Sequence, residues 1–338
     1  MYSWKWNLNE LNPNKEVKVF STFSCGGGST MGYKRAGFKV LGNCEIDPQM
    51  NDMYKKNHHP KYNYLMDLRD FNKLENLPEE LYHLDILDGS PPCSTFSTQG
   101  IREKAWGETK KFREGQKAQR LDDLFFVYLD TVEKLQPKIS IAENVYGIIM
   151  GKARGYCNEI IKRYHDIGYD VQIFRLNAAR MDVPQTRERI FFIANNQNYP
   201  KLQLEFDNDL IPFGKIRTEH GKPINKNTTI WRMAQLIKYG DRKLSHTSKR
   251  ERHKDTMYSI PILYDTNVAK TLTAGSLPIR FVDREWCSEL DCIHMQTFPE
   301  DYDFMNNQVG YVCGMSVPPN MMANIADEIW RQWLCRKS

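Results

Sequence analysis

The sequence lacks the features that mark several specialised classes of protein. None of its eight cysteines belongs to a Cys-x-x-Cys pair, which argues against zinc ribbons and thioredoxin-like redox sites. No apolar run approaches the roughly 20 residues that a membrane span needs. The segment 1–15 lacks the apolar core of a signal peptide, and we find neither internal repeats nor low-complexity segments. We therefore expect a cytoplasmic globular chain with reduced thiols, no bound metal and no membrane partner.

Positive charge is concentrated in one part of the chain. The 338 residues carry a formal net charge of +5. Between Lys215 and Lys254 there are twelve Lys or Arg and three Asp or Glu, so this segment carries +9 and the rest of the chain −4. A basic module on a mildly acidic body is typical of proteins that bind a polyanion. Charge alone leaves a solvated surface without a partner equally open.

The first half of the chain alternates between β-rich runs and helical spacing. We expect strands at 17–23, 39–45, 84–88, 139–143, 169–177 and 189–194, and helices at 29–36, 48–57, 121–135 and 155–167. Strands separated by helices of this length predict an α/β fold with a doubly wound, mostly parallel sheet.

The pattern changes after Asn195, where a polar, basic stretch contains several prolines and shows no alternation of strands and helices. We therefore predict one domain at 1–194 and a smaller one at about 195–300. The segment 301–338 contains apolar residues at helical spacing in 323–334 and is expected to return to the first domain.

Three features near the first strands favour an adenosine-containing ligand. The run Phe23-Ser-Cys-Gly-Gly-Gly28 joins a strand to a helix, where glycines let a ligand approach the backbone. Glu45 ends the second strand, where a carboxylate commonly holds a ribose diol. Asp67 could accept a hydrogen bond from an exocyclic amine. The alternatives are an ordinary glycine turn, a surface carboxylate and a helix cap.

Two further strand ends carry candidate reactive groups. Cys93 follows Pro91-Pro92 in a polar loop, and a thiol presented there suits a nucleophile better than a buried structural cysteine. Glu143 ends a neighbouring strand and could donate a proton to a ring nitrogen, although Glu-Asn is also ordinary turn chemistry. In the extended run 185–189, Gln185, Arg187 and Arg189 should share one face and point toward phosphate, a carbonyl oxygen or Glu143. The alternative is an exposed edge strand with mixed charges.

With these residues assembled, the chain resembles the DNA cytosine-5 methyltransferases of bacterial or phage type. Six motifs of that family occur in its order between Phe23 and Pro319. They are Phe-Ser-Cys-Gly-Gly-Gly, Glu-Ile-Asp-Pro, Gly-Ser-Pro-Pro-Cys, Glu-Asn-Val, Gln-Thr-Arg-Glu-Arg and Gly-Met-Ser-Val-Pro-Pro. The resemblance implies the fold of S-adenosylmethionine-dependent methyltransferases, with a catalytic domain at 1–194 and a target-recognition domain at 195–300. Cys25 and Met315 stand where the family usually has Gly and Asn.

The resemblance also implies roles for individual residues. Cys93 would add to C6 of a flipped-out cytosine, Glu143 would contact N3, and Arg187 and Arg189 would lie near the base or the DNA backbone. The residues that would bind S-adenosylmethionine are Phe23, Gly27, Gly28, Glu45, Ile46, Asp67, Leu68, Pro92 and Ser316. The residues that would contact DNA are Ser97, Gln185, Lys249, Arg250 and Arg252.

The implied substrate is double-stranded DNA, and a companion restriction endonuclease is a further partner that the resemblance allows. Two alternatives stay open. An RNA cytosine-5 methyltransferase on the same fold would be expected to carry a Cys-Phe-Thr tripeptide, which is absent here. A catalytically silent DNA-binding regulator would not need Cys93, Glu143 and both arginines. The sequence does not indicate which bases are recognised.

Overall fold

The structure, a computed structural model, describes all residues except 93–108, 111–118, 121–123, 152, 254–258 and 336–338. The chain divides into two compact units. The sheet unit comprises Leu11–Leu176, Glu188–Glu205 and Met322–Ser338, and the second unit comprises Met1–Glu10, Asn177–Arg187 and Phe206–Met321. Each unit therefore combines segments that are distant in the chain. The domain boundaries expected at 194 and 300 stay predictions.

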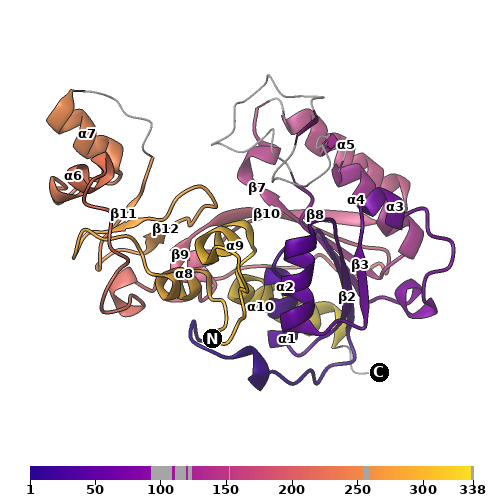
Figure 1. Cartoon of the computed structure of the whole chain (residues 1–338). Helices are drawn as coiled ribbons and strands as arrows, with labels where there is room; N and C mark the ends of the chain where they lie inside the picture. Colours follow the sequence, from indigo (N-terminus) through magenta and orange to yellow (C-terminus); the bar gives the residue numbers. More distant parts are fainter. Residues whose placement is uncertain (93–108, 111–118, 121–123, 152, 254–258, 336–338) are drawn as a thin grey trace. The chain divides into compact units, whose positions relative to one another are not determined.

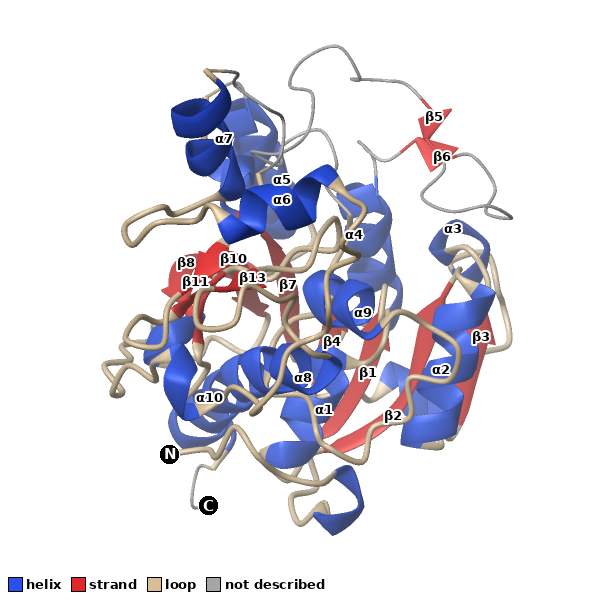
Figure 2. Cartoon of the chain, turned by 60° about the vertical axis from the view of Figure 1, so that its left-hand side comes forward, coloured by secondary structure: helices blue, strands red, loops and turns tan. Residues whose placement is uncertain are grey.

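The sheet unit is built on seven strands in the order β3-β2-β1-β4-β7-β10-β8 (Figure 2). Neighbours from β3 to β7 run parallel, whereas β10 is antiparallel to β7. This arrangement confirms the predicted α/β fold with a mostly parallel sheet. The strands are β1 (Lys18–Thr22), β2 (Lys39–Glu45), β3 (Tyr62–Leu65), β4 (Ile86–Gly89), β7 (Ile139–Val145), β8 (Asp170–Asn177) and β10 (Glu188–Asn195).

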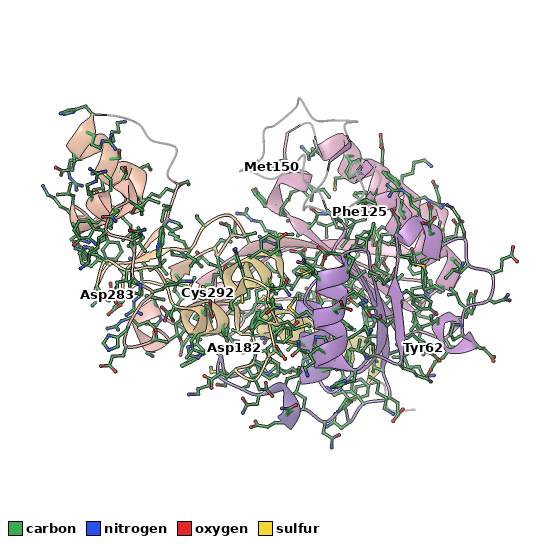
Figure 3. The ribbon with its side chains drawn as sticks, in the orientation of Figure 1. Tyr62, Phe125, Met150, Asp182, Asp283 and Cys292 are labelled. Carbon is green, nitrogen blue, oxygen red and sulfur yellow. The ribbon has the colours of Figure 1, made fainter. Side chains whose placement is uncertain are left out.

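Helices lie against this sheet as a doubly wound fold requires. Their bounds are α1 (Gly28–Arg35), α2 (Pro48–His58), α3 (Leu68–Phe71), α4 (Leu124–Leu135), α5 (Ala153–Asp166) and α10 (Pro319–Ile329). Apolar residues of α3, α4 and α5 share one core with Phe20, Leu87 and Phe192 of the strands. Phe125 of α4, labelled in Figure 3, packs edge-on against Phe192 with ring centroids 5.1 Å apart.

The second unit consists of short elements. Its helices are α6 (Thr229–Gln235), α7 (Leu244–Arg252), α8 (Glu289–Gln296) and α9 (Val309–Met315), with α6 and α7 orange in Figure 1. Its strands are β9 (Gln185–Thr186), β11 (Ile262–Leu263), β12 (Ala269–Lys270) and β13 (Ile279–Arg280), paired as β11-β13 and β12-β9. A small apolar core joins α6 and α7 to β11 and β13.

The remaining described elements are short. They are the 3₁₀ turns Leu8–Glu10, Glu79–Tyr82, Tyr146–Ile149, Ala178–Arg180 and Phe213–Lys215, the π-helical turn Trp330–Leu334, and the pair β5 (Thr109–Lys110) and β6 (Gln119–Arg120). Within the described part of the chain, no helix is both long and apolar enough to cross a membrane.

Candidate active site at the strand ends of the sheet unit

The glycine turn between β1 and α1 has a conformation that few side chains tolerate. Cys25 and Gly27 both have positive φ, at 47° and 79°. A Cβ atom on Gly27 would lie 2.2 Å from Nε2 of His58, so only glycine fits there. The turn is therefore packed directly against the last residue of α2, and its backbone can face a ligand on the other side.

Glu45 at the end of β2 holds this turn. Its Oε2 accepts the Cys25 N–H at 2.8 Å, and its Oε1 accepts the N–H groups of Ile46 and Asp47 at 2.9 Å each. Burial raises the pKa of Glu45, and the backbone donors oppose that shift. Because a carboxylate offers roughly four acceptor positions, three bonds leave capacity for a ligand hydroxyl.

A small, partly open hollow lies beside these residues. It is lined by Phe23, Cys44, Ile46, Met66, Asp67, Leu68 and Leu124, which include four of the predicted cofactor residues. Asp67 also caps α3 by accepting the Arg69 N–H at 2.8 Å, so it caps a helix and lines the hollow at once. An aromatic and aliphatic wall with one carboxylate fits the adenosine part of S-adenosylmethionine.

The chain that leaves β4 is anchored to its neighbour β7. The side-chain amide of Asn144 donates to the Pro91 carbonyl at 3.1 Å, and Asn144 itself is buried. Pro92 is half-buried, whereas Cys93 and Ser97 lie outside the described residues. The segment that leads into Cys93 is therefore fixed at the same sheet edge as Glu143.

Glu143 and Arg189 form an ion pair across β7 and β10. Nε of Arg189 lies 2.7 Å from Oε1 of Glu143, and both side chains are largely buried. Arg189 stands opposite Val145 and Phe191 opposite Glu143, so the pair is a diagonal contact on one face of the antiparallel ladder. This register explains why residues 46 positions apart in the chain meet.

Asp88 is a buried acid at this edge that the sequence analysis missed. It accepts hydrogen bonds from the Ser21 hydroxyl at 2.8 Å and the Tyr33 hydroxyl at 3.1 Å. Burial raises the pKa of Asp88 to about 7, and the nearby charge of Glu143 contributes. Its position directly before the Gly-Ser-Pro-Pro-Cys motif was the available signal.

Other predicted site residues belong to the second unit and are buried inside it. The guanidinium of Arg187 donates to the carbonyls of Leu272, Gly314 and Ser316 at 3.0 Å each. The Gln185 side chain donates to the Met295 carbonyl at 3.0 Å. The alternative prediction of an exposed edge strand at 185–189 is therefore wrong, because Gln185 and Arg187 are 0% and 1% exposed. The catalytic role of Arg187, the DNA contact of Gln185 and the cofactor contact of Ser316 stay predictions.

The three predicted DNA contacts on α7 differ in their surroundings. Lys249 and Arg252 are exposed. In contrast, the Arg250 guanidinium bonds both carboxylate oxygens of Asp241, at 2.6 and 2.7 Å, and the Leu236 carbonyl at 2.7 Å. Arg250 thus ties α7 to the preceding turn, whereas Lys249 and Arg252 are available to a partner.

Comparisons with known proteins agree with these motifs. A family profile described as C-5 cytosine-specific DNA methylase matches residues 17–275. The Type II methyltransferase M.FnuDI of Fusobacterium nucleatum is 33% identical over 190 residues, 56% of this chain and 50% of that protein. The Type II methyltransferase M.AplI of Arthrospira platensis is 26% identical over an alignment that covers 96% of this chain and 90% of that protein. The match to M.FnuDI thus spans only half of that relative.

A solved structure shares the fold across most of the chain. It is a candidate DNA modification methyltransferase encoded within an Escherichia coli prophage, with a TM-score of 0.67. The similarity covers 95% of this chain and 100% of that one at 19% sequence identity, which supports the fold alone.

Proposed function

Because the chain belongs to the C-5 cytosine-specific DNA methylase family, we propose that it methylates C5 of cytosine in a specific double-stranded DNA sequence. The observation that carries the proposal is the Glu143–Arg189 ion pair of 2.7 Å. Glu143 of this pair lies on β7, which neighbours β4, and β4 leads into Pro91, Pro92 and Cys93. Family membership and this geometry together favour a nucleophile and an acid at one sheet edge.

S-adenosylmethionine, when bound, supplies the methyl group. We propose that Glu45 accepts a ribose hydroxyl, that Asp67 accepts the adenine amine, and that the side chains of Phe23, Ile46 and Leu68 pack against the adenosine. The hollow beside β1 and β2 supports this assignment. Gly27 and Gly28 allow the backbone to approach the ligand, and Pro92 and Ser316 complete the proposed set.

The chain's own groups would then activate the base. C5 of cytosine is a poor nucleophile, and addition of the Cys93 thiolate at C6 makes it reactive. Glu143 would share a proton with N3, which stabilises that addition. Arg189 pairs with Oε1 of Glu143 and would hold this carboxyl group in place beside the base. After methyl transfer, a proton acceptor such as water removes the C5 proton. The electrons of the C5–H bond re-form the C5–C6 double bond, and the Cys93 thiolate leaves C6.

The base must leave the duplex to reach these groups, which costs roughly a few kcal/mol. Phosphate contacts from the basic segment 215–254, including Lys249 and Arg252, would offset that cost. We propose Ser97, which precedes basic residues in the same loop sequence, as a further DNA contact. The reaction would take place in the cytoplasm. The relative M.FnuDI is named a Type II methyltransferase, so a companion restriction endonuclease is the proposed protein partner.

The proposal is tested with random-sequence duplex DNA that contains 5-fluorocytosine. Fluorine cannot leave C5 as a positive ion, so the reaction should stop after methylation with Cys93 still bonded to C6. We expect a denaturation-resistant protein–DNA adduct that requires S-adenosylmethionine. Cys93→Ser should abolish the adduct and lower methyl transfer to ordinary DNA at least about 1000-fold. Cys335→Ser, at an exposed cysteine, is the matched control.

Each alternative gives a different result. Methyl transfer to tRNA but not to DNA would replace the proposed substrate with RNA. A silent regulator would bind DNA and transfer no methyl group to either. If the protein methylates the fluorinated DNA and forms no adduct, Cys93 is not the nucleophile.

A further inference from the structure

Tyr239 is an exposed residue of the second unit at the edge of an aromatic cluster. Tyr239 lies between α6 and α7 and is 79% exposed. Its ring meets those of Tyr264 and Phe281 edge-on, with centroids 5.3 and 5.9 Å away. Tyr264 and Phe281 pack against each other at 4.5 Å, and the Arg284 guanidinium lies 3.9 Å from the Phe281 ring. The cluster therefore supports the Tyr239 ring from beneath and leaves its outer part free to contact a partner.

The turn that carries Tyr239 is held by buried polar contacts. The Tyr264 hydroxyl accepts the Gly240 N–H at 3.1 Å and donates to the Asp241 carbonyl at 2.8 Å. The Asp241 carboxylate accepts the Lys238 N–H at 3.0 Å and pairs with Arg250 at 2.6 Å. A side chain fixed in this way loses little further freedom on binding, which favours a contact residue.

The charge around this turn is mostly positive, with the exposed carboxylate of Glu251 lying 3.8 Å from Lys238 Nζ. Lys238, Arg242 and Lys243 are exposed on either side of Tyr239. The acidic residue within the turn, Asp241, is buried and paired with Arg250, so it adds no free negative charge to the surface. Leu236 and Val282 are also exposed, at 42% and 53%. An aromatic residue among exposed cations matches the combination of phosphate and base or sugar contacts in a nucleic-acid interface.

We propose that the Tyr239 turn (residues 238–243) is a DNA-contact element. In it, Tyr239 packs against bases or sugars in a groove of the duplex, and Lys238, Arg242 and Lys243 bind the flanking phosphates. Arg250 acts as a positioning residue that holds the turn through Asp241. This inference rests on the proposed function, since it assigns a contact to the same DNA substrate. The proposal also changes the role expected for Arg250: this residue holds the Tyr239 turn in place and does not contact DNA directly.

The experiment separates the aromatic contact from the ionic contacts by salt dependence. The probe is a duplex of about 30 base pairs that carries a site methylated by the wild-type protein, with Kd measured across a range of salt concentrations. Tyr239→Ala should weaken binding about tenfold or more with the slope of log Kd against log salt unchanged. Lys243→Ala should reduce that slope by about one. Tyr239→Phe should bind like the wild type, because the ring is retained.

Two further variants complete the design. Tyr82→Ala, at an exposed tyrosine of the sheet unit, should leave DNA affinity unchanged. Arg250→Gln should weaken binding without changing the salt slope, as expected for a positioning residue. A slope reduced by about one would instead make Arg250 a direct phosphate contact and overturn its positioning role. Affinity for S-adenosylmethionine, measured on every variant, should stay at the wild-type value.

The outcomes distinguish this inference from the proposed function. If the wild-type protein methylates DNA but Tyr239→Ala binds the duplex with unaltered affinity, the inference is wrong and the proposed function stands. If the wild-type protein transfers no methyl group, a random-sequence duplex of the same length replaces the probe; weaker binding of that duplex by Tyr239→Ala would then mean that the proposed function fails and the inference stands.

Discussion

Different interactions hold the backbone in place in the two compact units. In the sheet unit, β7 and β10 pair continuously from Val145–Arg189 to Ile139–Asn195, and the strands bury apolar side chains. In the second unit every strand has two residues. There, buried polar side chains hold the backbone: Arg187 bonds three carbonyls, and Arg280 pairs with Asp291 at 3.2 Å and with Asp283, labelled in Figure 3, at 2.8 Å.

This difference determines which substitutions each unit should tolerate. Loss of an apolar group from the sheet unit removes one of many packing contacts and leaves the ladder hydrogen bonds intact. Loss of one buried cation from the second unit leaves several carbonyls or a carboxylate without partners in a dry environment. The stability of the second unit should therefore depend on a few charged side chains.

The largest expected effect is at Arg187. Arg187→Met removes three hydrogen bonds to buried carbonyls while it keeps much of the side-chain volume. We expect the free energy of unfolding to fall by about 3–5 kcal/mol, measured by urea denaturation. Arg180→Met is the matched control in the same unit, because Arg180 pairs with the exposed Asp207; its effect should stay within about 0.5 kcal/mol. A variant of Arg187 that is stable but inactive would favour a direct catalytic role instead.

A smaller effect is expected in the sheet unit, at Asp88. Burial raises the pKa of Asp88 to about 7, above the roughly 3.9 of an unfolded aspartate. Folding therefore favours the protonated form, so this contribution to stability is fully present below about pH 4 and is lost as the pH rises to about 7. Asp88→Asn resembles the protonated acid, and its stability relative to wild type should increase over that interval by on the order of 3 kcal/mol.

The measurement is urea denaturation of both proteins between pH 4 and 7.5. Asp70→Asn is the control, because Asp70 is an exposed carboxylate of the same unit. A constant difference between Asp88→Asn and wild type across the range would contradict the pKa assigned to Asp88. It would then follow that the hydroxyls of Ser21 and Tyr33 compensate fully for burial.

The sheet unit could be predicted from the sequence because its elements repeat a simple pattern. The strand at 39–45 was predicted with its observed bounds, and the helix at 48–57 begins at Pro48 as expected, where Asp47 caps it. The strand β3 (Tyr62–Leu65) was missed, because its residues are only partly buried and give little apolar signal. The antiparallel direction of β10 was also not predicted, since strand direction depends on the connections and not on composition.

The site could be predicted in part. The glycine turn and Glu45 were expected at strand ends, and they follow β1 and end β2. Glu143 was expected to end its strand, which instead continues to Val145. The roles of these residues stay predictions. The burial of Arg187 and the pairing of Arg250 with Asp241 were not foreseen, because they depend on residues distant in the chain or on a turn without a sequence signature. Asp88 was missed for a related reason: burial among other elements raises its pKa, and hydrogen bonds from Ser21 and Tyr33 oppose that shift. Contacts of this kind do not follow from local pattern.

The smallest expected effect is at Cys25, where the sequence departs from the family. Cys25 has a φ of 47°, in the left-handed region that costs a side chain roughly 1–2 kcal/mol. Cys25→Gly relieves that strain but gives the unfolded chain more freedom, a loss of about 0.5–1 kcal/mol. The Cys25 N–H, which donates to Glu45, is retained. The net change in the free energy of unfolding should therefore be within about 1 kcal/mol, with affinity for S-adenosylmethionine preserved.

Cys25→Val tests whether backbone strain at position 25 affects stability and cofactor binding. A β-branched residue is disfavoured at positive φ more strongly than cysteine, so this variant should be less stable than wild type by about 1–2 kcal/mol. It should also bind S-adenosylmethionine more weakly, because a turn forced out of this conformation moves the N–H that Glu45 holds. Cofactor affinity that is equal in wild type and Cys25→Gly but lower in Cys25→Val, measured by calorimetry, would place the effect in the backbone. Equal affinity of all three would contradict an effect of the backbone conformation at position 25 on cofactor binding.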